Sequence, residues 1–107
     1  LTYGETEILF TGDITAEIEE RLLTGEEELL DADILKVGHH GSRDGTGRAF
    51  LRAVSPQVAI ISVGENRYGH PAARTVKHLE ETQADIFRTD RDGDVEFWSD
   101  GKRFWKR

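Results

Sequence analysis

The stretch VAIISV, residues 58–63, decides the fold class of this chain. It is continuously apolar and rich in β-branched side chains, which is typical of a strand whose two faces are both covered. The stretch RAFLRAV, residues 48–54, precedes it and predicts a short helix. That helix should end at Ser55-Pro56, because a residue before proline avoids the helical region. A buried strand after a helix predicts a sheet with helices packed against it.

The segments on either side of this strand repeat the same alternation. Three more stretches predict strands, and two more predict helices, the second with Pro71 in its first turn. Two short stretches near the C-terminus, bounded by turn residues, predict a hairpin. The strands are 7–11 (EILFT), 33–37 (DILKV) and 85–89 (DIFRT), the helices are 14–25 and 71–81, and the hairpin pairs 95–98 with 102–106. The predicted fold class is α/β, a mixed sheet with flanking helices and a C-terminal hairpin.

Composition limits the classes of protein to which the chain can belong. Its 107 residues suffice for one domain with a modest core. There is no cysteine, which excludes disulfides and thiolate metal sites. No apolar run approaches the roughly 20 residues that span a bilayer. Because the chain begins with Leu1 and contains no methionine, we expect it to be a piece of a longer protein.

The net charge of −7 is unevenly distributed. Residues 1–35 hold eleven acidic side chains and one basic one, whereas the remainder holds ten acidic and thirteen basic ones. Only the N-terminal third would therefore repel a nucleic acid, and a polyanionic substrate is not excluded. The basic end, KRFWKR at 102–107, could meet phosphates and bases. Alternating aromatic residues in a hairpin more often form core on one face, with charges on the other.

Three polar clusters follow predicted strands, at the edge where parallel sheets usually bind ligands. They are Gly12-Asp13, the motif GHHGS at 38–42 and YGHP at 68–71. Carboxylate and imidazole groups are common ligands of divalent metal ions. Three such clusters at matching positions favour a metal site over three unrelated loops.

Taken one at a time, the same residues have structural explanations. Asp13 stands before a predicted helix, where an N-cap or an Asx turn is common. His70 could be only a loop residue, and His78, among charged helical neighbours, is interpreted as solvated. His39 and His40 are adjacent, and in an extended chain their side chains would point to opposite sides. Unless the chain turns there, at most one of them would bind a given metal ion.

Four stretches together resemble the C-terminal part of the metallo-β-lactamase-like domain of ComEC-type DNA-internalisation competence proteins. The resemblance runs over nearly the whole chain in the same order. Its specific elements are TGD, HHGS and RYGHP, whereas the helices are generic. The four stretches are ILFTGDITAEIEERLL (8–23), ADILKVGHHGS (32–42), VAIISVGENRYGHP (58–71) and RTDRDGDVEF (88–97).

This resemblance implies an αββα sandwich, of which residues 1–107 would be a C-terminal fragment, about half. It implies a metal-dependent hydrolase that holds zinc or manganese and acts as a nuclease, with metal-bound hydroxide attacking phosphorus. Asp13 matches a bridging aspartate, His39 or His40 a histidine ligand, and His70 a ligand or phosphate contact. Asp13 and His70 are thus also the candidate catalytic residues.

The resemblance also implies partners and a location. The parent would be a bacterial inner-membrane protein of natural transformation, with this domain soluble and no small-molecule cofactor. Single-stranded DNA would be its substrate, and the candidate DNA contacts here are Ser42, Arg67, Lys102 and Arg103.

One expected motif is absent from the chain. The superfamily's main ligand string, His-x-His-x-Asp-His or a close variant, does not occur in it. We therefore expect the upstream half of the same domain to be a partner. Without that half, the chain should bind metal weakly or not at all, lack nuclease activity, and expose an apolar sheet face that could drive self-association.

Two other functions stay open at this point. One is a non-catalytic α/β module that binds a partner or a DNA backbone through its basic end. The other is a hydrolase of the same fold with a different substrate, such as a lactone or a phosphodiester metabolite.

Overall fold

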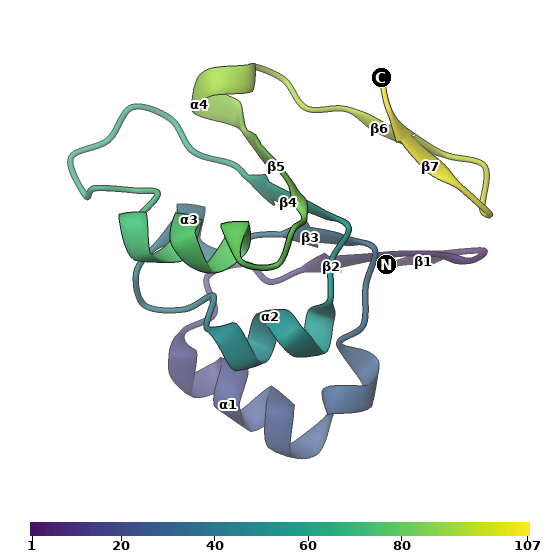
Figure 1. Ribbon diagram of the computed structural model, residues 1–107, viewed down its shortest axis with the longest axis horizontal. Coiled ribbons are helices and arrows are strands. Elements are labelled where there is room, and N and C mark those ends of the chain that lie inside the picture. Colours follow the sequence, from purple (N-terminus) through teal and green to yellow (C-terminus); the bar gives the residue numbers. More distant parts are fainter.

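A five-stranded sheet organises the computed structural model, which describes residues 1–107 (Figure 1). Its strands lie side by side in chain order, and every neighbouring pair is parallel except the first, which is antiparallel. The sheet is therefore mixed, as the sequence predicts. The first strand was not predicted, because two residues carry no hydrophobic pattern. The strands are β1 (Thr2–Tyr3), β2 (Thr6–Phe10), β3 (Ile34–Lys36), β4 (Val58–Ile61) and β5 (Asp85–Arg88).

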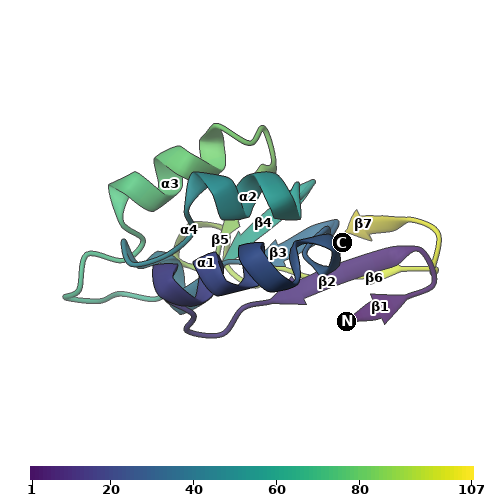
Figure 2. The ribbon, with the colours of Figure 1, turned by 90° about the horizontal axis from the view of Figure 1, so that it is seen from below.

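Three helices connect the successive parallel strands and pack on one face of the sheet (Figures 1 and 2). Right-handed crossovers between adjacent parallel strands place consecutive helices on the same face. The longest helix has ten residues, and no helix is long and apolar enough to cross a membrane. The helices are α1 (Ala16–Gly25), α2 (Arg48–Val54), α3 (Ala73–Glu80) and the short α4 (Thr89–Asp92), with helical turns η1 (Glu27–Leu29) and η2 (Gly38–Gly41).

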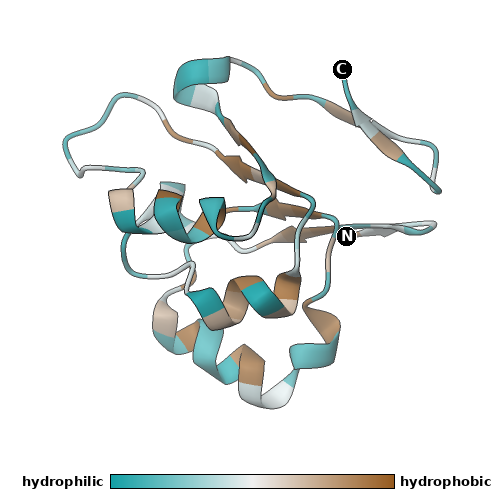
Figure 3. Ribbon diagram, viewed as in Figure 1, coloured by the Kyte–Doolittle hydropathy of each residue, from teal (hydrophilic) through white to brown (hydrophobic).

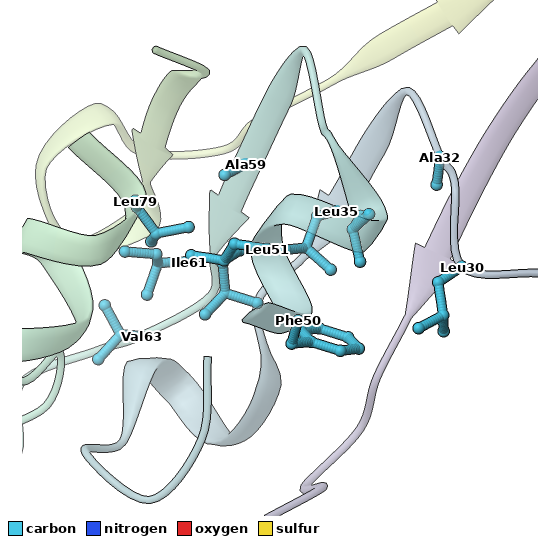
Figure 4. Close-up of a cluster of buried hydrophobic side chains, with 11 residues drawn as sticks. Leu30, Ala32, Leu35, Phe50, Leu51, Ala59, Ile61, Val63 and Leu79 are labelled. Carbon is cyan, nitrogen blue, oxygen red and sulfur yellow. The ribbon is translucent and has the colours of Figure 1, made fainter. Parts of the chain in front are cut away.

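The core lies between the sheet and the helices (Figure 4). Side chains alternate along a strand, so one cross-strand row of residues faces the helices. Burying one leucine of this kind contributes about 2 kcal/mol to the free energy of unfolding. The row is Leu9, Leu35, Ala59 and Ile86, and it meets Phe50, Leu51 and Val54 of α2 and Leu79 of α3.

The opposite face of the sheet is only partly covered. The predicted hairpin forms as β6 (Phe97–Ser99) and β7 (Phe104–Lys106), and it lies on the side of the sheet away from α1–α3 (Figures 1 and 2). The rings of Phe87 and Phe97 meet edge to face, with centroids 5.6 Å apart. Figure 3 shows how the apolar residues concentrate in the strands, yet Phe10 on β2 is 64% exposed. The face away from the helices is therefore only partly covered, whereas the sequence of 58–63 predicts a strand covered on both faces.

Two expectations around α3 are wrong. Pro71 lies outside the helix, which begins at Ala73. His78 is buried rather than solvated, with 5% of its surface exposed, and its Nδ1 lies 3.0 Å from the carbonyl oxygen of Thr46. The reason is that α3 packs against the loop at 42–47 as well as against the sheet. His78 is therefore buried, although its neighbours in the sequence are charged.

The hairpin follows the predicted pattern on one face only. Phe97 and Phe104 are half-buried against the sheet side, as expected of core residues. The other face does not hold charges alone, because Trp98 and Trp105 pair across the strands there with 48% and 44% of their surfaces exposed.

Candidate metal centre

The HHGS motif forms a turn immediately after β3, not an extended segment. His39 (φ 46°, ψ 46°) and His40 (φ 55°, ψ 25°) both adopt the left-handed conformation, and Gly41 follows with φ 78°. The expectation that the two side chains point to opposite sides therefore does not apply, and their ring centroids lie 6.2 Å apart. For residues other than glycine this conformation costs roughly 1–2 kcal/mol each, and such strain often accompanies a functional site.

His40 is fixed in one tautomer by its backbone contact. Its Nδ1 lies 2.8 Å from the carbonyl oxygen of Ser62, just past β4. Because a carbonyl oxygen can only accept, Nδ1 carries the proton and donates it. The neutral ring then keeps its lone pair on Nε2, which is the arrangement that metal-binding histidines usually have.

His39 contains the one buried side-chain polar atom that lacks a hydrogen-bond partner. This atom is Nδ1, while the backbone N–H of the same residue donates to the carbonyl of Gly12 over 2.8 Å. A buried polar atom without a partner costs about 1–3 kcal/mol. A metal ion at Nδ1 would remove that cost, so this atom fits a ligand role.

His70 comes beside His39 from a distant part of the chain. Their rings meet edge to face, with centroids 5.5 Å apart. The backbone N–H of Ala72 donates to the carbonyl of Gly41 over 2.8 Å and ties the two loops together. A Cβ at Gly41 would lie 2.6 Å from the Cβ of Pro71, so only glycine fits this approach.

Asn66 holds the loop that carries His70, and sequence reasoning missed it. Its Oδ1 accepts the backbone N–H groups of Tyr68 and His70, both over 3.0 Å. Its Nδ2 donates to the carbonyls of Gly64 and His70 over 3.0 and 2.8 Å. An asparagine in a glycine-bounded loop is a recognised turn signal, so the segment GENRYG offered a clue to this role.

Asp13 reaches the same edge through the end of β2. The carbonyl of Gly12, its neighbour, is the acceptor for the N–H of His39. Asp13 is not the N-cap of α1, which is Thr15, and its exposed carboxylate makes no hydrogen bond within the chain. Burial lowers the pKa of Lys36 at the end of β3, and the negative charge of Asp13 opposes that shift. Lys36 is thus a cation near Asp13 that the sequence did not single out.

Side chains from two helices fix the loop that follows HHGS. The buried carboxylate of Glu19 on α1 accepts the backbone N–H groups of Thr46 and, over 3.0 Å, Gly47. Burial raises the pKa of Glu19, and these two hydrogen bonds oppose the rise. Thr75 on α3 donates its hydroxyl to the carbonyl of Ser42 over 2.8 Å. Hydrogen bonds from α1 and α3 therefore hold the loop at 42–47 in place.

The candidate DNA contacts are not brought together. Ser42 is 8% exposed, and its hydroxyl accepts the N–H of Asp44, so it stabilises a turn rather than lying on the surface. Arg67 is exposed in the loop that also carries His70. Lys102 and Arg103 lie at the hairpin turn, in a shallow pocket with residues that begin β2, β4 and β5, at the opposite ends of the strands.

The structure thus brings His39, His40 and His70 to one edge of the sheet, with the loop of Asp13 beside them. No three histidine, aspartate or glutamate side chains of the chain are grouped closely enough to hold a metal ion by themselves. The donor chemistry nevertheless suits one, with a free Nε2, a partnerless Nδ1 and an unpaired carboxylate. The arrangement is an incomplete ligand set.

Comparison with known proteins bears on this site. The sequence model of the metallo-beta-lactamase superfamily matches residues 1–65, which include Asp13, His39 and His40. The mixed sheet with its flanking helices is consistent with part of that fold. No solved structure shows significant similarity to the chain.

Three curated relatives extend the likeness over most of the chain. They are ComE operon protein 3 of Bacillus subtilis (38% identical over 83% of this chain), Competence protein ComA of Neisseria gonorrhoeae (35% over 88%) and Recombination protein 2 of Haemophilus influenzae (34% over 86%). The aligned part is 12%, 14% and 11% of each relative, respectively. The chain therefore spans only a small part of the length of the proteins that it resembles.

Proposed function

The chain belongs to the metallo-beta-lactamase superfamily, and from that premise we propose that it forms part of a metal-dependent phosphodiesterase that cuts DNA during uptake. The observation that carries this proposal is the partnerless buried Nδ1 of His39, with the ring of His70 5.5 Å away. The names of the relatives in Bacillus and Neisseria support a role in competence, and single-stranded DNA is the substrate that such a role suggests.

The residues of this chain would contribute in distinct ways. His40 presents Nε2 because Nδ1 donates to Ser62, and His39 offers Nδ1. The free carboxylate of Asp13 adds the negative charge that a divalent cation favours. A bound zinc or manganese ion would supply an activated water and neutralise charge on a phosphate. His70, whose loop Asn66 holds, would bind the ion or donate a hydrogen bond to the phosphate.

The remaining ligands would come from the upstream half of the same domain. A catalytic zinc site takes about three protein ligands plus water, and the chain by itself groups fewer. The exposed Phe10 marks apolar surface of the sheet that such a half could cover. The parent protein would lie in the bacterial inner membrane. The chain alone should bind metal weakly and show no nuclease activity.

The experiment compares the chain with a longer protein that includes the preceding residues. The longer protein should cleave a labelled single-stranded oligonucleotide with Zn²⁺ or Mn²⁺, and His39→Ala or Asp13→Asn should lower that rate by at least 100-fold. His78→Gln serves as the matched control, because His78 is buried away from the ligand set. Equal cleavage by the His39 and His78 variants would refute the proposal.

A non-catalytic module is the second candidate. The specific observation in its favour is the hairpin, whose exposed Trp98 and Trp105 lie beside basic side chains. Arg107 sits over the ring of Trp98, 4.9 Å from its centroid. If this surface were the functional one, Trp105→Ala would reduce DNA binding while the histidine variants left it unchanged.

A further inference from the structure

Tyr68 is the most exposed large side chain next to the candidate metal centre. Its surface is 83% exposed, and its ring lies beside that of His70, with centroids 5.7 Å apart and planes tilted by 32°. No other aromatic ring of the chain lies against it. A large aromatic surface left in water beside a site is a candidate for ligand contact.

The backbone that carries this ring is held in place before any ligand arrives. The N–H of Tyr68 donates to Oδ1 of Asn66, and Nδ2 of the same asparagine donates to the carbonyls of Gly64 and His70. A side chain carried on a loop that is already ordered loses less conformational entropy on binding. The exposure of Tyr68 is therefore not explained by a loose loop.

The pocket beside Tyr68 favours an uncharged group. Besides Tyr68, it is lined by the two histidines His40 and His70, by the exposed acid Glu65, and by Val63, Gly64 and Asn66. The carboxylate of Glu65 would repel a phosphate placed in this pocket. Arg67, next to Tyr68 in the chain, is exposed, forms no ion pair and does not line this pocket. A phosphate would therefore bind more favourably near Arg67, outside the pocket.

We propose that Tyr68 stacks on an unpaired nucleobase of single-stranded DNA and so directs the adjoining phosphate toward His39, His40 and His70. The inference rests on the proposed function, because it takes single-stranded DNA as the substrate. Aromatic side chains stack on any base, since every base has a π-face. Tyr68 is then a positioning residue, and base-paired DNA, whose bases are already stacked, is excluded from it.

The test measures binding of a fluorescent oligothymidylate by the 107-residue chain, using fluorescence anisotropy at fixed salt. Tyr68→Leu should weaken binding by about fivefold to 100-fold. Tyr68→Phe keeps the ring and should bind within about twofold of the wild type. The matched control is Tyr3→Leu, since Tyr3 is also exposed (60%) but lies on β1. An abasic oligomer of the same length should bind the wild type and Tyr68→Leu equally.

Three results would overturn the inference. They are no binding by the wild type, equal binding by Tyr68→Leu, or the same loss with the abasic oligomer. Failure of the proposed function looks different, because Tyr68-dependent binding would then persist while the longer protein cleaved no DNA. Conversely, metal-dependent cleavage that is insensitive to Tyr68→Leu, in KM as well as kcat, would leave the proposed function standing and refute the stacking role alone.

Discussion

Replacement of Asn66 by alanine should loosen one loop of the site while leaving the core intact. The change removes the acceptor for the N–H groups of Tyr68 and His70 and the donor to the carbonyls of Gly64 and His70. Because the loop is exposed, water replaces part of what is lost, and each hydrogen bond contributes at the low end of about 0.5–1.5 kcal/mol. The free energy of opening this loop should therefore fall by about 1–2 kcal/mol, which corresponds to roughly fivefold to 30-fold faster amide exchange.

Amide hydrogen exchange followed by NMR measures this effect residue by residue. The amides of Tyr68 and His70 should accelerate, whereas that of Leu51, which donates to Gly47 at the start of α2, should not. Asn66→Asp is an intermediate case, because it keeps an oxygen that can accept both N–H groups but loses the two donations of Nδ2 to the carbonyls of Gly64 and His70, so it should retain only part of their protection. Unchanged exchange in Asn66→Ala, or equal acceleration at Leu51, would refute the reasoning.

Three further predictions concern the turn and its supports. His40→Gly should have a free energy of unfolding about 1 kcal/mol higher than His40→Ala in urea titrations, because glycine adopts the left-handed conformation freely; equal values would mean that the turn stores no strain. Gly41→Ala should lower the free energy of unfolding by about 2 kcal/mol or more, since its Cβ would meet Pro71 and its φ is 78°. Gly64→Ala, whose Cβ meets nothing, should change it little, and similar losses in both variants would contradict the close approach. Burial raises the pKa of Glu19 above its ordinary value of 4.5, so the folded state holds this proton more tightly than the unfolded state does. The free energy of unfolding should then fall as the pH rises from 4.5 toward the raised pKa, and Glu19→Gln should remove that part of the slope, whereas an unchanged slope would refute the assignment.

Much of the fold follows from local sequence patterns. The apolar run at 58–63 contains β4, which ends two residues earlier at Ile61, and the helix predicted at 48–54 forms as α2 with those bounds. The order of strands follows because each helix returns the chain to the neighbouring position in the sheet. The covering of the two sheet faces could not be predicted in the same way. It depends on where the hairpin lies, and contacts such as Phe87 to Phe97 join residues that no local pattern relates.

The sequence was enough to predict which residues belong to the candidate site, but not how their side chains are arranged. Strand ends placed Asp13, His39, His40 and His70 at one edge, because parallel strands end together. The left-handed turn at His39 and His40 was not predicted, since histidine adopts that conformation more often than most residues other than glycine but still only rarely. His78 was misjudged because its partner, the carbonyl of Thr46, lies 32 residues away in the chain. The supporting roles of Asn66 and Glu19 depend on similar contacts between side chain and backbone.

The central claim is that His39, His40 and His70 form part of a metal centre, and NMR of the imidazole nitrogens tests it most directly. Zinc is added in excess to a ¹⁵N-labelled longer protein that includes the preceding residues, because the chain by itself groups too few ligands, and the ring signals of His39, His40, His70 and His78 are followed. We predict that Nδ1 of His39, Nε2 of His40 and a ring nitrogen of His70 shift with one common saturation curve, and that His78 does not move. Signals of His39, His40 and His70 that stay unchanged, or that shift no more than His78, would contradict the account.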